Sequence, residues 1–302
     1  MKFYQYKIKI SDDLIGKSLK IILKKWLIPR YLRGLLRIDH RLTLNGEYVS
    51  VDQKAKKGDI LSFYLYPEDF SGQQNYCPVS DHRLKIIYEN EDFLVADKPA
   101  GMKMHPHSPE ENDTLLNYIQ AQMANKRSRG LTAKAFMVHR LDRQTSGAVI
   151  VAKNPLACSI LNRFFAKKII SKIYLAWVSG SFSTNSGRIS LPIKKDPLNP
   201  YRRIISKDDG LPAETDWTKI HTVYQNTLLR ISLKNGRTHQ IRVHLASIGH
   251  PLIGDDLYGG IDYPRLLLHS AAISFPALFS GCQRRISIAA QLPSDFPRQL
   301  RL

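Results

Sequence analysis

The chain is organised around a polar turn, Val138-His139-Arg140-Leu141-Asp142-Arg143-Gln144-Thr145-Ser146-Gly147, which leads into the apolar run AVIVAKN of residues 148–154. Within the turn, Asp142 stands between two arginines and among small polar residues. Nearby positive charge favours an ionised carboxylate, so Asp142 is a candidate nucleophile or base. A surface turn could also use an aspartate to cap its backbone or to pair with an arginine. The four residues RLDR alone leave both interpretations open.

Strand-like runs surround this turn on both sides. They are LKIIYEN (84–90), FLVADKP (93–99), GAVIVAKN (147–154), KIYLAWVSG (172–180), TLLRISL (227–233) and LLLHSAAISF (266–275). Helical stretches are expected at residues 114–124, 155–166 and 239–248. Since strands outnumber helices and their turns are short, residues 82–302 are predicted to form an α+β domain with a mixed, largely antiparallel sheet.

Residues 1–66 form a separate, smaller α/β unit in this interpretation. An alternating strand at 3–10 precedes two expected helices, at 18–27 and 31–38. The sequence LTLNGEYV (42–49) follows, and its Asn45-Gly46 step between apolar-alternating segments is a strong hairpin signal. A turn and a strand, AKKGDILSFYLY (55–66), close the unit. Residues 67–81 are polar and contain two prolines and a glycine, which is typical of a mobile linker.

Positive charge points to a polyanionic partner. The 45 Lys and Arg outnumber the 26 Asp and Glu, which gives a net charge of +19, and such a field attracts nucleic acid. On the expected helices of the first unit we take five residues as candidate RNA contacts: Lys20, Lys24, Arg30, Arg33 and Arg37. No apolar run reaches the ~18 residues that a membrane-spanning helix needs. The N-terminus lacks the apolar core of a signal peptide, so we expect a cytoplasmic protein.

Neither a metal nor a cofactor follows from the sequence. Cys77, Cys158 and Cys282 are widely scattered, without the spacing of a zinc site or a disulfide framework. The closest histidine pairs, His105/His107 and His239/His244, also lack a ligand pattern.

The full string HRLDRQTSG (139–147) resembles the catalytic motif of pseudouridine synthases of the RluA type. Four further blocks follow this family's order: DKPAGMKMHP (97–106), KIYLAWVSG (172–180), LKNGRTHQIRVHLASIGHPLIGDDLYG (233–259) and LLLHSAAISF (266–275). The first unit resembles the S4 RNA-binding fold, on the segments PRYLRGLLR (29–37), LTLNGEYV (42–49) and KKGDIL (56–61). Together these resemblances span nearly the whole chain.

The resemblance implies roles for individual residues. Asp142 would be the catalytic aspartate, Tyr174 the active-site tyrosine that stacks on the target base, and Arg242 the basic residue that pairs with the aspartate. Arg140 would fill the gap in the RNA stack, while His139 would order the motif by hydrogen bonding. Arg237 and Thr145 are the neighbouring candidates for substrate contacts. Such an isomerisation needs no metal or redox cofactor.

Several alternatives stay open. The favoured substrate is large-subunit (23S) ribosomal RNA, because the family more often attaches an S4-like unit to enzymes that act there; transfer RNA is the second choice. A nonenzymatic S4-type RNA-binding or assembly protein would share the charge and the first unit. A glycoside or nucleoside hydrolase would also use a carboxylate, but usually with a second one. We expect a monomer, and whether the aspartate adds to the sugar or promotes its proton loss is left open.

Overall fold

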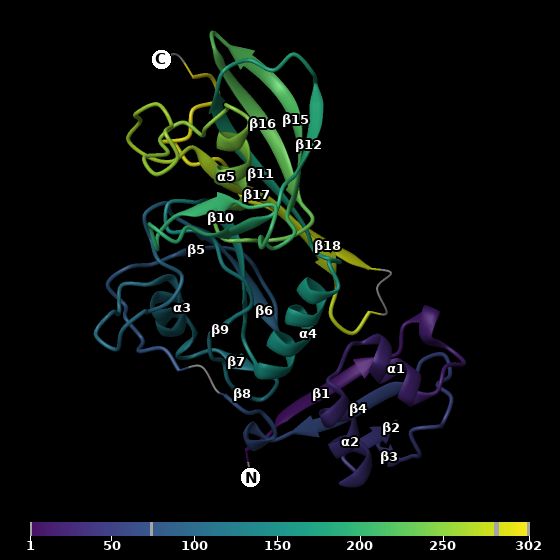
Figure 1. Ribbon diagram of the computed structural model, residues 1–302. Coiled ribbons are helices and arrows are strands. Elements are labelled where there is room, and N and C mark those ends of the chain that lie inside the picture. Colours follow the sequence, from purple (N-terminus) through teal and green to yellow (C-terminus); the bar gives the residue numbers. More distant parts are fainter. Residues whose placement is uncertain (1, 73–74, 281–283, 301–302) are drawn as a thin grey trace.

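Two sheets of unequal size define the protein. The computed structural model describes residues 2–72, 75–280 and 284–300. In Figure 1 the N-terminal four-stranded sheet forms the lower lobe, and a ten-stranded sheet runs through the rest of the molecule. The expected α+β class with a mixed, largely antiparallel sheet is confirmed. Cys282 lies outside the described residues, and no helix within them is long and apolar enough to cross a membrane.

The N-terminal sheet has the strand order β1-β4-β2-β3, with two helices on one face. Its elements are β1 (Tyr4–Lys9), α1 (Leu19–Lys25), α2 (Arg30–Ile38), β2 (Leu42–Leu44), β3 (Glu47–Tyr48) and β4 (Ile60–Leu65), with short 3-10 turns at Asp12–Leu14 and Pro67–Asp69. Asn45 and Gly46 both have positive φ, 56° and 93°, as a tight two-residue hairpin requires. The predicted strand, helices and hairpin are therefore confirmed within one or two residues.

The large sheet has the order β12-β15-β16-β11-β17-β10-β6-β5, with β18 beside β17 and β9 beside β10. Its strands are β5 (Lys85–Glu89), β6 (Phe93–Lys98), β9 (Phe136–Met137), β10 (Ser146–Ala152), β11 (Ser171–Ser179), β12 (Ser186–Ser190), β15 (Glu214–Val223), β16 (Asn226–Leu233), β17 (Leu268–Pro276) and β18 (Arg285–Ala289). Two small hairpins lie outside it, β7 (Arg127–Ser128) with β8 (Leu131–Thr132), and β13 (Ile193–Lys195) with β14 (Arg203–Ile205). The strands that lie outside the predicted runs are β7, β8, β9, β12, β13, β14, β15 and β18.

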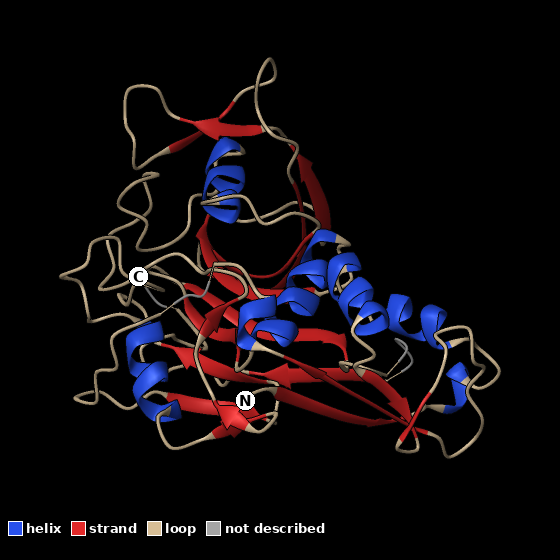
Figure 2. Ribbon diagram, turned by 90° about the horizontal axis from the view of Figure 1, so that it is seen from below, coloured by secondary structure: helices blue, strands red, loops and turns tan. Residues whose placement is uncertain are grey.

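Helices cover both faces of the central strands. Along β10, Ile150 packs into the cluster that contains α4 (Pro155–Ala166), and Val149 and Val151 pack into the cluster that contains α3 (Leu115–Met123). Such strands are buried on both sides, which explains why AVIVA is apolar throughout instead of alternating. The third helix, α5 (Gln240–Ser247), packs against β14 and β15 in the other half of the sheet. Figure 2 shows these helices grouped around the curved strands.

The two halves of the large sheet meet at β10 and β17. Among the described residues this is the one parallel pair in the sheet, and it is short: Ser146 lies opposite His269, and Gly147 opposite Ser270. Gly147 has φ of +109°, and a Cβ placed there would lie 2.3 Å from the Ser270 carbonyl oxygen. Only glycine fits this approach.

The N-terminal unit is docked on the larger one by a buried polar and aromatic contact. The Arg129 guanidinium lies 5.0 Å from the Tyr6 ring centroid and 5.5 Å from that of Phe279, and its Nε donates to Asp92 over 2.8 Å. The Tyr6 hydroxyl donates to Asn154 Oδ1 over 3.1 Å. The linker is also anchored: Arg41 pairs with Asp69, and the Asn117 side chain donates to the Cys77 carbonyl. The expected mobile linker is thus held near both ends.

Gly147→Ala should lower the free energy of unfolding by about 2–4 kcal/mol, because the added Cβ meets backbone atoms and the positive φ is retained. Thermal unfolding followed by tryptophan fluorescence measures the loss.

Gly101→Ala is the matched control. Its φ is +82°, but no atom lies within 4 Å of the added Cβ, so it should cost only about 1–2 kcal/mol. Equal losses in the two variants would contradict the close approach of β10 and β17.

Candidate active site

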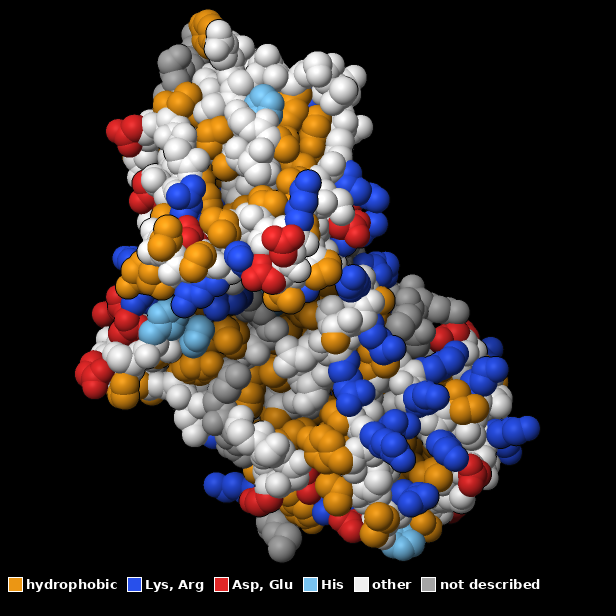
Figure 3. Space-filling view, in the orientation of Figure 1, with side chains coloured by type: hydrophobic (Ala, Val, Ile, Leu, Met, Phe, Trp, Pro, Cys, Tyr) orange, Lys and Arg blue, Asp and Glu red, His pale blue; other side chains and the backbone are white. Residues whose placement is uncertain are grey.

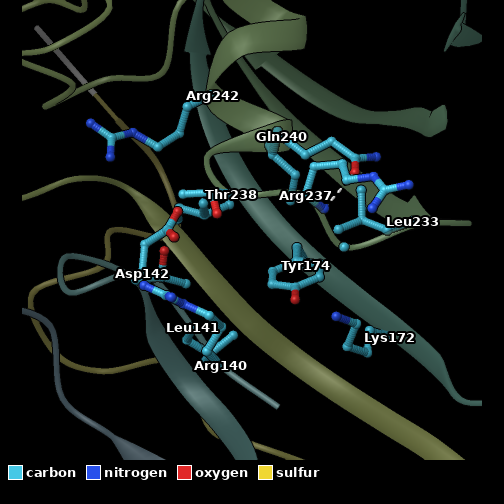
Figure 4. A pocket seen from close by; sticks show the side chains of 14 residues that line it. Arg140, Leu141, Asp142, Lys172, Tyr174, Leu233, Arg237, Thr238, Gln240 and Arg242 are labelled. Carbon is cyan, nitrogen blue, oxygen red and sulfur yellow. Dashed lines mark hydrogen bonds between the residues drawn. The ribbon is translucent and has the colours of Figure 1, made fainter. Parts of the chain in front are cut away.

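The polar turn before β10 opens into a pocket of about 520 Å³, including space open to solvent. Its walls come from that turn, from β11, from the start of β17 and from the segment between β16 and α5 (Figure 4). The lining residues include Arg140, Asp142, Thr145, Tyr174, Arg237 and Arg242. The structure therefore brings six of the seven predicted active-site residues together from three distant segments.

Asp142 presents its carboxylate to the pocket. The turn is closed by the Thr145 amide, which donates to the Asp142 carbonyl oxygen over 3.1 Å, and Thr145 itself is buried. Within the described part of the chain, the Asp142 carboxylate forms no hydrogen bond or ion pair. A half-buried carboxylate with free lone pairs is available to a bound ligand.

Lys98 stabilises the turn that carries Asp142 through hydrogen bonds to backbone carbonyls. It is fully buried at the end of β6, and its Nζ donates to three carbonyl oxygens: Pro99 at 2.9 Å, and Met102 and Arg143 at 2.8 Å. Burial lowers the pKa of Lys98 to about 7, while the charge of Asp142 acts in the opposite direction. The lysine ties the DKPAGM segment to the backbone that follows Asp142. Lys98 was not among the predicted site residues, although its position in the family segment DKPAGMKMHP could have pointed to it.

Tyr174 forms the central wall. It lies on β11, next to a register shift in the pairing with β17, and only 4% of its surface is exposed. In Figure 4 its ring stands between Asp142 on one side and Lys172 and Arg237 on the other. The Lys172 Nζ lies 5.8 Å from the centroid of this ring. The tyrosine therefore offers an aromatic surface inside the pocket, as the prediction of a stacking residue requires.

Arg242 has a different partner from the predicted one. Its Nε and Nη2 donate to Asp255 over 2.7 and 2.6 Å, and the Asp255 side chain is 0% exposed. No ion pair joins Arg242 to Asp142 in the described residues, although both line the pocket. Burial lowers the pKa of Arg242, but the hydrogen bonds and charge of Asp255, together with the charge of Asp142, raise it overall. Arg242 therefore does not form the expected ion pair with Asp142, because Asp255 accepts the hydrogen bonds of its guanidinium group. Arg242 and Asp142 attract each other only at longer range.

Arg140 and Arg237 lie at the rim of the pocket, and His139 lies behind them, outside the pocket lining. The Ile150 amide donates to His139 Nε2 over 3.0 Å, and burial lowers the pKa of His139 to about 3. A ring that stays neutral near pH 7 suits the ordering role expected for it, not proton transfer. Arg140 and Arg237 are exposed, and Arg237 Nε donates to the Pro212 carbonyl over 3.2 Å. His139 is the predicted residue that does not line this pocket.

The five predicted RNA contacts of the first unit lie on the other lobe. Lys20 and Lys24 are on α1, and Arg30, Arg33 and Arg37 are on α2. Together with Tyr48 and Ser50, four of them line a shallow groove: Lys20, Arg30, Arg33 and Arg37. None of the five forms an ion pair with another described residue. Figure 3 shows Lys and Arg side chains crowded over this lobe and continuing toward the region where the lobes meet.

Asp255 is the acidic residue that the sequence-based reasoning missed. It accepts both bonds of Arg242 and, at 3.2 Å, the amides of Leu257 and Tyr258. The GDDLYG segment pointed to an aspartate here, but the sequence could not show which of its two adjacent aspartates is buried. The structure separates them, since the Asp256 side chain is 94% exposed. Across the described residues, no group of three or more His, Cys, Asp or Glu side chains could hold a metal ion.

Comparisons with known proteins agree with this geometry. A family model described as RNA pseudouridylate synthase matches residues 92–247, more than half of the chain, and a model of the RluD ribosomal pseudouridine synthase N-terminal domain matches residues 6–61. A protein of Zymomonas mobilis named ribosomal large subunit pseudouridine synthase D is 35% identical, with 95% of this chain and 94% of that protein covered. A Bacillus subtilis protein named as an uncharacterized RNA pseudouridine synthase is 36% identical over 81% of this chain and 76% of its own length.

A solved structure is also similar to this chain. The human RNA pseudouridylate synthase domain containing 1 protein superimposes with a TM-score of 0.57 at 25% identity, covering 72% of this chain and 86% of that one.

Asp255→Asn should lower the free energy of unfolding by about 3–5 kcal/mol, because it leaves the buried Arg242 without its charged partner. Urea unfolding monitored by fluorescence measures the change. Asp256→Asn, the same substitution at the adjacent exposed position, should stay within about 0.5 kcal/mol of wild type. Similar losses in both variants would refute a special role for the Asp255 pair.

Proposed function

The chain belongs to the RNA pseudouridylate synthase family, and we propose that it isomerises specific uridines of large-subunit ribosomal RNA to pseudouridine with Asp142 as its catalytic carboxylate. The observation that carries the residue assignment is the pocket itself. Asp142, Tyr174 and Arg242 converge there, and the Asp142 carboxylate is left free of protein partners among the described residues.

The pocket favours an isomerase over a hydrolase. Among its described lining residues, Asp142 is the only carboxylate, whereas glycoside hydrolysis usually needs a second one as partner acid. A uracil that leaves the ribose must also be retained so that it can rejoin through carbon. The Tyr174 face and the apolar side chains of Leu141, Ile241 and Leu268 supply such a holding surface.

The roles of the residues follow from this arrangement. Asp142 acts on the C1′ region of the ribose, by addition or by assisting proton loss, and Tyr174 stacks on the detached base. Arg242, fixed by Asp255, places positive charge in the same pocket as the Asp142 carboxylate. Arg140 and Arg237 at the rim, with Thr145 beside Asp142, contact the RNA around the target. No step in this scheme needs an oxidant, a reductant or a second substrate.

Support for ribosomal RNA comes from the relatives and from the first unit. Several relatives that cover most of this chain are named ribosomal large subunit pseudouridine synthase D. The unit at residues 1–66 fits an RNA-binding role, because its two helices present unpaired cations on one face. We accordingly propose three parts: an RNA-binding domain at 1–66, a linker at 67–81 and a catalytic domain at 82–302. A cytoplasmic, monomeric enzyme remains part of this proposal.

Asp142→Asn should lower pseudouridine formation by about 10³-fold or more, as loss of an essential catalytic group does. RNA affinity should change little. The assay incubates purified protein with large-subunit ribosomal RNA transcribed in vitro, and detects pseudouridine by chemical modification and primer extension.

Asp113→Asn, which removes an exposed carboxylate away from the pocket, is the control and should keep full activity. Free uracil is measured in the same reactions. Its release by the wild type in amounts comparable to pseudouridine would favour the hydrolase, and an active Asp142→Asn variant would refute the residue assignment.

Lys20→Ala combined with Arg33→Ala should weaken RNA binding and make its salt dependence shallower by about 2 in the log–log slope. Turnover of bound RNA should not change. Filter binding across a series of KCl concentrations gives the slope, and single-turnover kinetics at saturating RNA give the rate.

Lys7→Ala combined with Lys9→Ala removes the same charge from the opposite face of the N-terminal sheet, since Tyr4 and Tyr6 alternate with them and point to the core. This control should keep the wild-type slope. A lost turnover rate in the Lys20/Arg33 variant at saturating RNA would contradict the division between binding and catalysis.

A further inference from the structure

A second hollow adjoins the active-site pocket on the side away from Asp142. It has a volume of about 970 Å³, including space open to solvent. It shares Arg140, Lys172, Leu233, Gly236 and Arg237 with the pocket, so these residues form the boundary between the two hollows. Figure 4 shows Lys172, Leu233 and Arg237 beyond the Tyr174 ring as seen from Asp142. We call this hollow the lysine groove.

Four segments build the lysine groove. The turn before β10 supplies Arg140, β11 supplies Lys172, and the connection from β16 to α5 supplies Lys234 to Arg237. The end of α4 supplies Phe165, and the turn that follows it supplies Lys168. Lys168 has a positive φ of 56°, a conformation that places it where the chain turns from α4 toward β11. The groove is therefore formed by the same segments that form the pocket, with α4 added.

The lining is strongly cationic. It contains Arg140, Lys168, Lys172, Lys234 and Arg237, and no carboxylate among its described residues. Lys234 is paired with Glu214 at 3.0 Å, whereas Arg140, Lys168 and Lys172 have no ion pair within the described chain. Clustered cations of this kind repel one another, and an anion that enters the groove relieves the repulsion.

Lys172 is held at the boundary between pocket and groove. Its Nζ lies 5.6 Å from the Phe165 ring centroid and 5.8 Å from that of Tyr174. The His139 ring packs on Phe165 at a centroid distance of 4.8 Å. Attraction of the ammonium to the two aromatic rings keeps it beside the pocket without neutralising its charge.

We propose that the lysine groove binds the RNA phosphate adjoining the target uridine, with Lys168 and Lys172 as its contacts and Phe165 as a positioning residue for Lys172. This inference rests on the proposed function, because it takes the pocket to hold a uridine of an RNA strand. A nucleotide in the pocket is covalently joined to its neighbours, and the adjoining cationic groove offers the neighbouring phosphate a site of opposite charge.

The test measures binding of fluorescein-labelled nonauridylate to the full-length protein by anisotropy over a range of KCl concentrations. Lys168→Gln should weaken binding about 5-fold and make the log–log salt slope shallower by about 0.7, the value for one phosphate contact on a single strand. Lys167→Gln is the matched control, because this neighbouring exposed lysine does not line the groove. It should stay within about 2-fold of wild type.

A nonauridylate with uncharged methylphosphonate linkages identifies the group that is bound. Lys168→Gln should leave the affinity for this neutral probe unchanged. Equal affinities of the Lys168→Gln and Lys167→Gln proteins for the charged probe would overturn the inference, as would an equal loss on the neutral one. These readouts do not depend on turnover, so their failure is distinct from a failure to form pseudouridine.

Discussion

The close approach of Gly147 to the Ser270 carbonyl is the contact on which the rest of the structure depends. It joins the strands β5, β6 and β10 to the strands from β17 to β12, so that one sheet forms from two halves. Asp142 lies in the turn just before this junction, and Tyr174 reaches the same point from β11, whose neighbour is β17. A larger residue at 147 would separate the two halves and would thereby open the site.

The site is then fixed by buried charge. Lys98 holds the backbone after Asp142 through three carbonyl oxygens, and Asp255 holds Arg242 through two hydrogen bonds. Both charges are removed from water, which is costly unless every donor is satisfied. These hydrogen bonds give a rigid frame in which the Asp142 carboxylate can stay unpaired. The docking of the N-terminal unit through Arg129 works in the same way, and it fixes where the basic faces of α1 and α2 lie relative to the pocket.

Local sequence signals predicted local structure well. Asn45-Gly46 predicted the hairpin, and the apolar run after Gly147 predicted a strand, which the structure buries on both faces. The strand Glu214–Val223 was missed because most of its side chains are polar, although its partner β16 follows across a short turn. The motif located Asp142, Tyr174 and Arg242, but the choice of Asp255 as partner of Arg242 depends on the fold of the GDDLYG turn. The anchoring of the linker at Asp69 and Cys77 likewise depends on tertiary contacts of Arg41 and Asn117 that no local pattern encodes.

The central claim, an Asp142-dependent pseudouridine synthase acting on large-subunit ribosomal RNA, is tested most directly in the host cell. The gene is deleted, pseudouridines are mapped across ribosomal and transfer RNA, and wild-type or Asp142→Asn protein is supplied from a plasmid. The account predicts that specific sites in large-subunit ribosomal RNA disappear and return only with the wild type. Sites that vanish from transfer RNA alone would contradict the proposed substrate, and sites restored by Asp142→Asn would contradict the proposed chemistry.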